Sequence, residues 1–333
     1  MKLPAIPGFA RSSHGAGAQS APARAGTDHR AAGGTLALFA ALTAAAVVAC
    51  SIAPDLQPST APDGSPAVSP SPAATSPGAT STPGIGEIDH PTGATDVVVR
   101  FEEGGGFVPA GFFATEAPIF TLYGDGTVIF RDATAAPPPD AEGIGRMTAF
   151  RTARLSEDEI QAFLARAVAD GGLGVARAQY VGPGADLPTA TFTLTAGDQL
   201  KTVSVTGLGL IDAASPDAPV LRALADLGEQ LRNFGPQIDD EGTWKPERWR
   251  GVLTPDAINA PRAWPWSEIE PADFVRHPEP GAPGFPVRTM STAEIDALGL
   301  GEIDGGFSGL ALTGPDGKAY TFALRPLFPD EAF

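Results

Sequence analysis

Clustered carboxyl groups are the residues whose types and spacing come nearest to catalytic chemistry in this chain. They fall in two places, at Asp239-Asp240-Glu241 and at Glu268, Glu270 and Asp273. Two carboxyl groups that flank a glycosidic bond supply the acid and the base or nucleophile of a glycoside hydrolase. Carboxylates also bind hard cations, although residues 239–242 do not alternate their ligands as a calcium loop does. Because an acidic chain also carries such clusters as solvated surface, we assign no catalytic, metal-binding or cofactor-binding residue.

A second unusual feature is the grouping of all the tryptophans in one stretch of 23 residues that is rich in Pro and Arg. These are Trp244, Trp249, Trp264 and Trp266. Indoles on a loop-rich segment can form a platform for sugars or for Pro-rich peptides, which dock in aromatic grooves. They can equally fix an irregular segment onto a sheet, because aromatic side chains bury a large area. The sequence therefore predicts either a groove for a glycan or protein ligand or an aromatic core.

Other catalytic signatures are incomplete. Gly172-Leu173-Gly174 and Gly207-Leu208-Gly209 lack the third glycine of a dinucleotide-binding loop, and neither opens a helix directly after a strand. At 306–309 the second glycine comes one position too early for a nucleophile elbow. A Ser-His-Asp site would depend on His90 or His277, and we interpret His277 as a loop residue. The chain is therefore more consistent with a binding protein than with an enzyme.

The charge balance excludes one class of partner. The 333 residues contain 22 Lys and Arg against 39 Asp and Glu, which gives a net charge of −17. Proteins that hold nucleic acid by charge need a surplus of basic residues on at least one face. We therefore expect no nucleic-acid partner.

The N-terminal region has the order of a secretory signal. Residues 31–49 carry no charge, and four basic residues but only one acidic residue precede them. A basic flank, a short apolar core and small residues are the parts of a signal peptide. An uncleaved transmembrane helix is the alternative, for which 19 residues are barely enough because spanning takes about 20.

The apolar run ends at the only cysteine of the chain. Val47-Val48-Ala49-Cys50 resembles the lipobox of bacterial lipoproteins. The resemblance covers the first fifty residues and implies that residues 1–49 are removed, that a diacylglycerol is attached to the sulfur of Cys50, and that the protein is anchored on the extracytoplasmic side of a bacterial membrane. Removing residues 1–49 takes away four basic residues and one acidic residue, so the net charge changes from −17 to −20.

A spacer follows the cysteine. Residues 53–84 contain eight Pro and ten Ser or Thr, no aromatic residue and two charges. Such a composition cannot bury enough apolar area to offset the entropy of ordering. We expect residues 50–95 to be a disordered tether; O-glycosylation of this stretch is an open alternative.

The remainder, residues 96–333, is expected to be a single domain, with a subdivision near 235 as an alternative. Alternation and turn signals predict strands at 95–101, 119–123, 127–130, 189–195, 201–206, 307–312 and 318–325. Capping residues Ser156 and Asp217 predict two longer amphipathic helices, and Ser291 predicts a short one. Residues 236–290 show little periodicity. Hairpins and separated helices indicate an α+β fold with antiparallel sheet, in which a ββα unit is repeated or merely recurs.

Two short motifs of this body suggest a relative. The YGDGTV sequence at Tyr123–Val128, followed by the helix start at Leu155–Glu159, resembles uncharacterised lipoproteins of the bacterial envelope. That resemblance implies no activity and no site residue. The sequence thus predicts a lipid-anchored envelope protein with a binding or interaction module; an anchored hydrolase is the alternative, and a solute-binding lipoprotein the third.

Overall fold

The computed structural model describes residues 86–331 except 109–112, 114, 132–135, 137, 236–241, 258 and 277–283. Cys50, the apolar run before it, most of the tether, the acidic residues 239–241 and His277 lie outside the described residues. All described residues belong to one compact unit, Thr75–Phe333. Strand residues outnumber helical residues in two sheets with three described helices, an architecture compatible with the α+β class. Along the described part of the chain, no helix has the length and apolar composition needed to cross a membrane.

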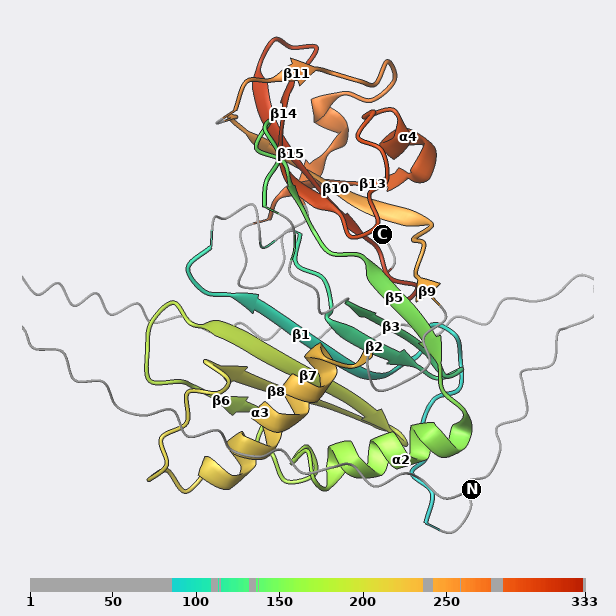
Figure 1. Ribbon diagram of the computed structural model, residues 1–333, viewed down its shortest axis with the longest axis vertical. Helices are drawn as coiled ribbons and strands as arrows, with labels where there is room; N and C mark the ends of the chain where they lie inside the picture. The colour runs from blue at the N-terminus through green and yellow to red at the C-terminus, as the bar shows by residue number, and fades with distance from the viewer. Residues whose placement is uncertain are drawn as a thin grey trace, which may run out of the picture. The chain divides into compact units, whose positions relative to one another are not determined.

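The first sheet has eight strands and occupies the lower part of Figure 1. In spatial order they are β6 (Gln179–Tyr180), β8 (Gln199–Thr206), β7 (Pro188–Ala196), β1 (Val97–Gly105), β2 (Phe120–Tyr123), β3 (Thr127–Arg131), β5 (Phe150–Arg154) and β9 (Gly242–Thr243). Only the β6–β8 pair is parallel. The two strands predicted at 119–123 and 127–130 are joined by an Asp-Gly turn, with Gly126 at a φ of +90° and its N–H donated to the Tyr123 carbonyl.

Two helices cover one face of this sheet (Figure 1): α2 (Glu157–Val168) and α3 (Ala218–Arg232). Their apolar stripes, with Leu164 and Leu227 at the centre, pack against the inward residues of the strands, among them Phe101 and Phe192. The alternation in β7 and β8 is what produces this face, because every second residue is buried. Asp217 lies at the N-cap of α3 as predicted, but its carboxylate pairs with Arg177 instead of bonding to the helix.

The second sheet has seven strands and occupies the upper part of Figure 1. Its order is β11 (Arg262–Ala263), β14 (Phe307–Thr313), β15 (Ala319–Pro326), β10 (Arg248–Pro255), β13 (Pro286–Ser291) and β12 (Val275–Arg276), and β4 (Gly145–Arg146) also pairs with β14. The short helix α4 (Thr292–Asp296) follows β13, and the 3-10 helix η2 (Pro271–Asp273) precedes β12.

Residues 236–290, expected to have little regular structure, contribute strands to this second sheet. β10 lies between β15 and β13 and pairs with both. Its sequence, RWRGVLTP, hides this role because Arg248 and Arg250 break the apolar run. Its pairing with β13 on one side and β15 on the other, and not its own hydrophobic pattern, identifies β10 as a central strand.

A short C-terminal segment, residues 327–331, contacts both sheets. Phe328 is fully buried in a cluster with Tyr123, Ile129 and Phe150 of the first sheet. Asp330 accepts hydrogen bonds from the Arg100 guanidinium at 2.6 Å and from the Tyr123 hydroxyl at 2.7 Å. On the other side, the Leu327 N–H donates to the carbonyl of Arg248 in β10. We call residues 327–331 the seam.

The body begins upstream of the predicted boundary at residue 96. The side-chain amide of Gln161 in α2 exchanges two hydrogen bonds with the backbone of Ile88. The His90 ring contacts Glu157 at 3.0 Å with its side chain only 4% exposed. Residues 88–91 are therefore packed on α2.

Candidate functional site

The four tryptophans are divided between two parts of the body. Trp249 and Trp266 are buried in the core of the second sheet, and the half-buried Trp264 meets Trp266 edge to face at 5.0 Å. Trp244 packs instead against Phe328 of the seam at 5.2 Å. It lines a separate cavity of about 320 Å³ with Lys245 and Arg248. The four indoles therefore do not form one shared platform.

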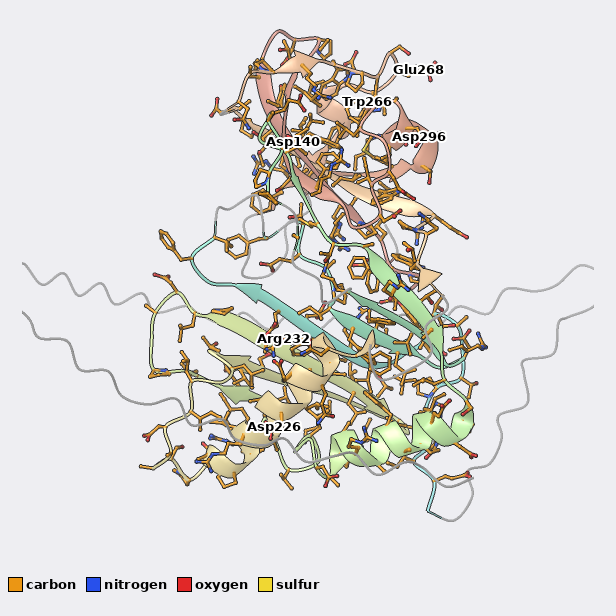
Figure 2. All side chains as sticks on the ribbon, viewed as in Figure 1. Asp140, Asp226, Arg232, Trp266, Glu268 and Asp296 are labelled. Atoms are coloured by element: carbon orange, nitrogen blue, oxygen red, sulfur yellow. The ribbon has the colours of Figure 1, made fainter. Side chains whose placement is uncertain are left out.

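Two of these indoles fix loops through their N–H groups. Trp264 Nε1 donates to the Ile269 carbonyl at 2.6 Å, and Trp266 Nε1 donates to the Glu294 carbonyl of α4 at 2.7 Å. A buried indole with a satisfied N–H combines a large apolar contact with a directional bond. Figure 2 shows Trp266 among the side chains of the second sheet and Glu268 at its outer edge. Glu268 is exposed and its carboxylate has no ion pair with a described residue.

The other predicted carboxylates of this stretch lie at η2. Asp273 accepts a hydrogen bond from the Glu270 N–H at 2.8 Å, as part of a capping box around the 3-10 turn. Asp273 therefore has a local structural role. The Glu270 side chain also lines the largest cavity described in the second sheet.

This cavity, which we call the Tyr320 groove, has a volume of about 550 Å³. Its apolar walls come from loops and strand ends that are distant in sequence: Leu253, Pro255, Pro271, Ala272, Phe274, Pro286, Pro315 and Tyr320. Its charged residues are Glu270, Asp316 and Lys318. Ligand pockets of about 300–1,000 Å³ typically combine apolar walls with a few polar groups in this way.

The β14–β15 turn places the polar side of the groove. Gly317 sits at a φ of +77°, as the turn requires, and donates its N–H to the Gly314 carbonyl. Asp316 then accepts the Tyr320 hydroxyl at 2.8 Å and lies 3.2 Å from the Lys318 ammonium. The Tyr320 hydroxyl, followed by the Lys318 N–H and ammonium, lowers the pKa of Asp316, so this carboxylate stays ionised at neutral pH.

Close packing joins this turn to η2. A Cβ at Gly314 would stand 2.7 Å from Asp316 Oδ1, 2.8 Å from the Tyr320 ring and 3.1 Å from Pro271 Cγ, so a larger residue here would displace the side chains of the groove. Trp264 packs edge-on against Tyr320, with 6.4 Å between the ring centres. The Tyr320 ring is therefore packed against Trp264 and lies next to the turn at Gly314.

The sequence identified only part of this groove. Glu270 belonged to the predicted carboxylates, and Trp264 supports Tyr320, but Asp316, Lys318 and Tyr320 were recognised only as parts of a hairpin. The sequence signal for this groove was a set of four prolines near aromatic residues. Proline is rigid and has no backbone N–H donor, so prolines suit the walls of a groove. They are far apart in sequence, and the pairing of β10 with β13 and β15 brings them together.

A second pair of carboxyl groups lies on the first sheet, where no motif indicated it. Burial raises the pKa of Glu102 in β1, and burial likewise raises the pKa of Glu116. Glu116 accepts the Gly105 N–H at 2.8 Å, and the nearby Glu102 raises its pKa further. A carboxyl group with a raised pKa is the type of group that serves as a general acid.

Comparison of the chain with protein-family models, with curated proteins and with solved structures found no match.

Proposed function

We propose that this chain is a lipid-anchored protein of the bacterial envelope whose body binds a ligand in the Tyr320 groove on the extracytoplasmic side. The observation that carries the binding role is the groove itself: about 550 Å³, apolar walls, and polar groups held on one side by a tight turn. A preformed site lowers the ordering cost of binding. The anchoring role is supported by Cys50 at the end of the apolar run.

The net charge of the mature chain implies that lipid, and not electrostatic attraction, would attach it to the membrane. A mature net charge of −20 is repelled by anionic lipids, so attachment would depend on the acyl chains on Cys50, at about 0.8 kcal/mol for each buried methylene. A Pro-rich tether would then hold the body away from the surface with the groove accessible.

The anchoring proposal is tested by metabolic labelling with a fatty-acid probe. The wild type should be labelled, and Cys50→Ser should not be. Labelling that persists in Cys50→Ser would contradict a lipid on this cysteine.

The binding proposal is tested by screening the full chain in detergent against a library of metabolites and glycans, with thermal shift as the readout. Ala272 is exposed and lines the groove, so Ala272→Trp should fill it and remove the hits. The matched control is Ala165→Trp, at an exposed position of α2 outside the described cavities. Hits that survive Ala272→Trp, or an absence of hits, would refute the groove as a binding site.

An anchored hydrolase is the second candidate. It is favoured by the raised pKa values of Glu102 and Glu116, both due first to burial. If it is correct, Glu102→Gln or Glu116→Gln should abolish hydrolysis of a chromogenic glycoside panel while Glu268→Gln leaves it unchanged. No hydrolysis by the wild type on that panel would count against it.

The recurrence of two strands and a helix is also kept as a proposal. The β7–β8 hairpin precedes α3 directly, whereas β4 and β5 stand between the β2–β3 hairpin and α2, and both helices pack in the same core. A duplicated ββα unit would account for this arrangement.

A further inference from the structure

We infer that the Tyr320 groove takes a small organic cation, a protonated amine carried on an apolar body. The inference rests on the proposed function, because it names the class of ligand for the same site. It follows from the hydrogen-bonding groups, the charge and the aromatic surface of the groove.

The side chains of the groove offer acceptors more than donors. Glu270 and Asp316 are acceptors when ionised, and the Tyr320 hydroxyl already donates its proton to Asp316, which leaves its oxygen as an acceptor. The four wall prolines have no N–H to contribute. Among the described residues that line the groove, the only side-chain donor left is the Lys318 ammonium, which Asp316 holds at 3.2 Å.

An acceptor-rich groove selects against the Pro-rich peptide suggested by the sequence and against anionic ligands. A polyproline peptide presents backbone carbonyls, which need donors such as free tyrosine hydroxyls or indole N–H groups. Here the Tyr320 hydroxyl and the Trp264 N–H are both bonded within the protein. A ligand with a carboxylate or phosphate would face two carboxylates and one ammonium. An ammonium donates three hydrogen bonds and accepts none, which complements this set.

Charge favours a cation over a neutral sugar. Two carboxylates and one lysine give the groove a net negative charge. Asp316 is partly neutralised by Lys318, but the Glu270 carboxylate forms no ion pair with any described residue. The chain as a whole has a charge of −17, which raises the local concentration of cations. A neutral glycan would gain nothing from either feature.

The apolar surface fits the rest of such a ligand. The Tyr320 ring is half-buried, with Trp264 behind it, and the prolines and Leu253 line the remaining wall. A cation over an aromatic face is attracted by the ring quadrupole, and its carbon body is removed from water by the walls. Trp264 is thus a positioning residue for Tyr320.

The test uses 2-phenylethylamine, protonated at neutral pH, and its uncharged isostere 2-phenylethanol, titrated against the full chain in detergent by calorimetry. We expect the amine to bind and the alcohol to bind at least about tenfold more weakly, because charge-assisted hydrogen bonds are lost. Amine binding should weaken when salt rises from about 20 mM to about 500 mM.

Matched variants locate the effect. Glu270→Gln should weaken amine binding by about tenfold. Glu268→Gln removes an exposed carboxylate two residues away that does not line the groove, and should leave binding unchanged. Ala272→Trp should abolish binding.

Equal binding of amine and alcohol, or a Glu270→Gln variant that binds the amine normally, would overturn the cationic class. If the amine fails to bind while library compounds of another class bind and are displaced by Ala272→Trp, the class is wrong and the groove still binds a ligand. If no compound depends on residue 272, both proposals fail.

Discussion

The two sheets of this body are built by different means. In the first sheet, strict alternation in β7 and β8 and the stripes of α2 and α3 bury aliphatic and phenylalanine side chains between regular elements. In the second sheet, the described residues form one short α-helix and one 3-10 turn, and the mainly aliphatic core contains two buried tryptophans, Trp249 and Trp266. The indole N–H groups of Trp264 and Trp266 bond to the backbone carbonyls of Ile269 and Glu294. The first region shows how periodicity makes a core, and the second shows how anchored loops make the walls of a groove.

This difference explains where the Tyr320 groove lies. Regular elements that meet along a continuous apolar face fill the space between them. Loops such as 264–274 cannot do so everywhere, because their backbone polar groups must also be satisfied. In the second sheet, the indole N–H groups of Trp264 and Trp266 satisfy two of these backbone carbonyls. The space between the loops that they fix remains open as the Tyr320 groove.

The largest expected effect tests whether the two regions unfold together. Phe328 of the seam is fully buried, with ring centres 5.1 Å from Phe150 and 5.2 Å from Trp244. Phe328→Ala should lower the free energy of unfolding by about 3–5 kcal/mol. Calorimetry should also show whether the single transition separates into two. The control is Phe107→Ala, since Phe107 is 92% exposed and its loss should change stability by less than about 0.5 kcal/mol. A Phe328→Ala variant as stable as the control would show that the seam does not couple the sheets.

A second prediction concerns the ion pair of the seam. The Glu331 carboxylate accepts two hydrogen bonds from Arg325, at 2.8 and 2.6 Å, and the Arg325 side chain is only 4% exposed. Glu331→Gln should cost about 3 kcal/mol at neutral pH, because it leaves a buried guanidinium without its counterion. Glu142→Gln is the matched control: it breaks an exposed Glu–Arg pair with Arg262, which should contribute at most about 1 kcal/mol.

The same pair predicts a dependence on pH. Burial opposes ionisation of Glu331, but the hydrogen bonds from Arg325 prevail and lower its pKa below the ordinary 4.5. A lowered folded-state pKa contributes stability that is complete above the unfolded pKa and is lost as the pH falls through the folded pKa. Urea denaturation should therefore show the difference between wild type and Glu331→Gln at its largest above pH 4.5 and shrinking below it. A difference that grows in acid would contradict this assignment.

The sequence predicted the first region far better than the second. The hairpins, Ser156 and the helix stripes are local signals, and the elements appear close to the expected residues. β10 and β13 of the second sheet were missed because their burial depends on neighbours distant in sequence, and β5 of the first sheet was also not predicted. Asp217 shows a smaller failure of the same kind: the residue is at the expected position, but Arg177, 40 residues away, takes its carboxylate.

The candidate site was harder to predict than the fold. The sequence located Glu270 and the tryptophans, because unusual residues stand out by count alone. It could not show that Tyr320, Asp316 and Glu270 line one groove, since that arrangement is set by strand pairing and by the close approach of Gly314 to Pro271. A single carboxylate in an acidic chain does not by itself indicate a binding site; the site becomes recognisable only when the fold brings several such groups together.

A fourth prediction tests the role of indole hydrogen bonds in the second region. Trp266 and Trp249 are both buried in the same cluster, but only Trp266 has a bonded N–H; Trp249 Nε1 finds no partner among the described residues. Trp266→Phe should cost about 1–3 kcal/mol more than Trp249→Phe, because it leaves the Glu294 carbonyl unsatisfied. Hydrogen exchange should increase in residues 262–276 and not in the first sheet. Equal losses in the two variants would mean that packing alone fixes these loops.

The smallest effect compares the same capping chemistry in both regions. Glu159 accepts the Ser156 N–H at 2.8 Å and its hydroxyl at 2.7 Å at the start of α2, and Glu294 does the same for Ser291 at the start of α4, where the Ser291 hydroxyl also accepts the Glu294 N–H at 3.4 Å. Ser156→Ala should cost about 1 kcal/mol, a typical value for a helix cap. Ser291→Ala should cost less, because Glu294 also pairs with Arg288 at 2.7 Å and remains fixed, whereas Glu159 has no ion pair with a described residue. Urea denaturation should show the larger loss of stability in Ser156→Ala. A larger loss in Ser291→Ala would contradict this order and would mean that the five-residue helix α4 depends on its cap more than the twelve-residue helix α2 does. In that case the stability of the second region would depend on its short helix more than on its indole hydrogen bonds.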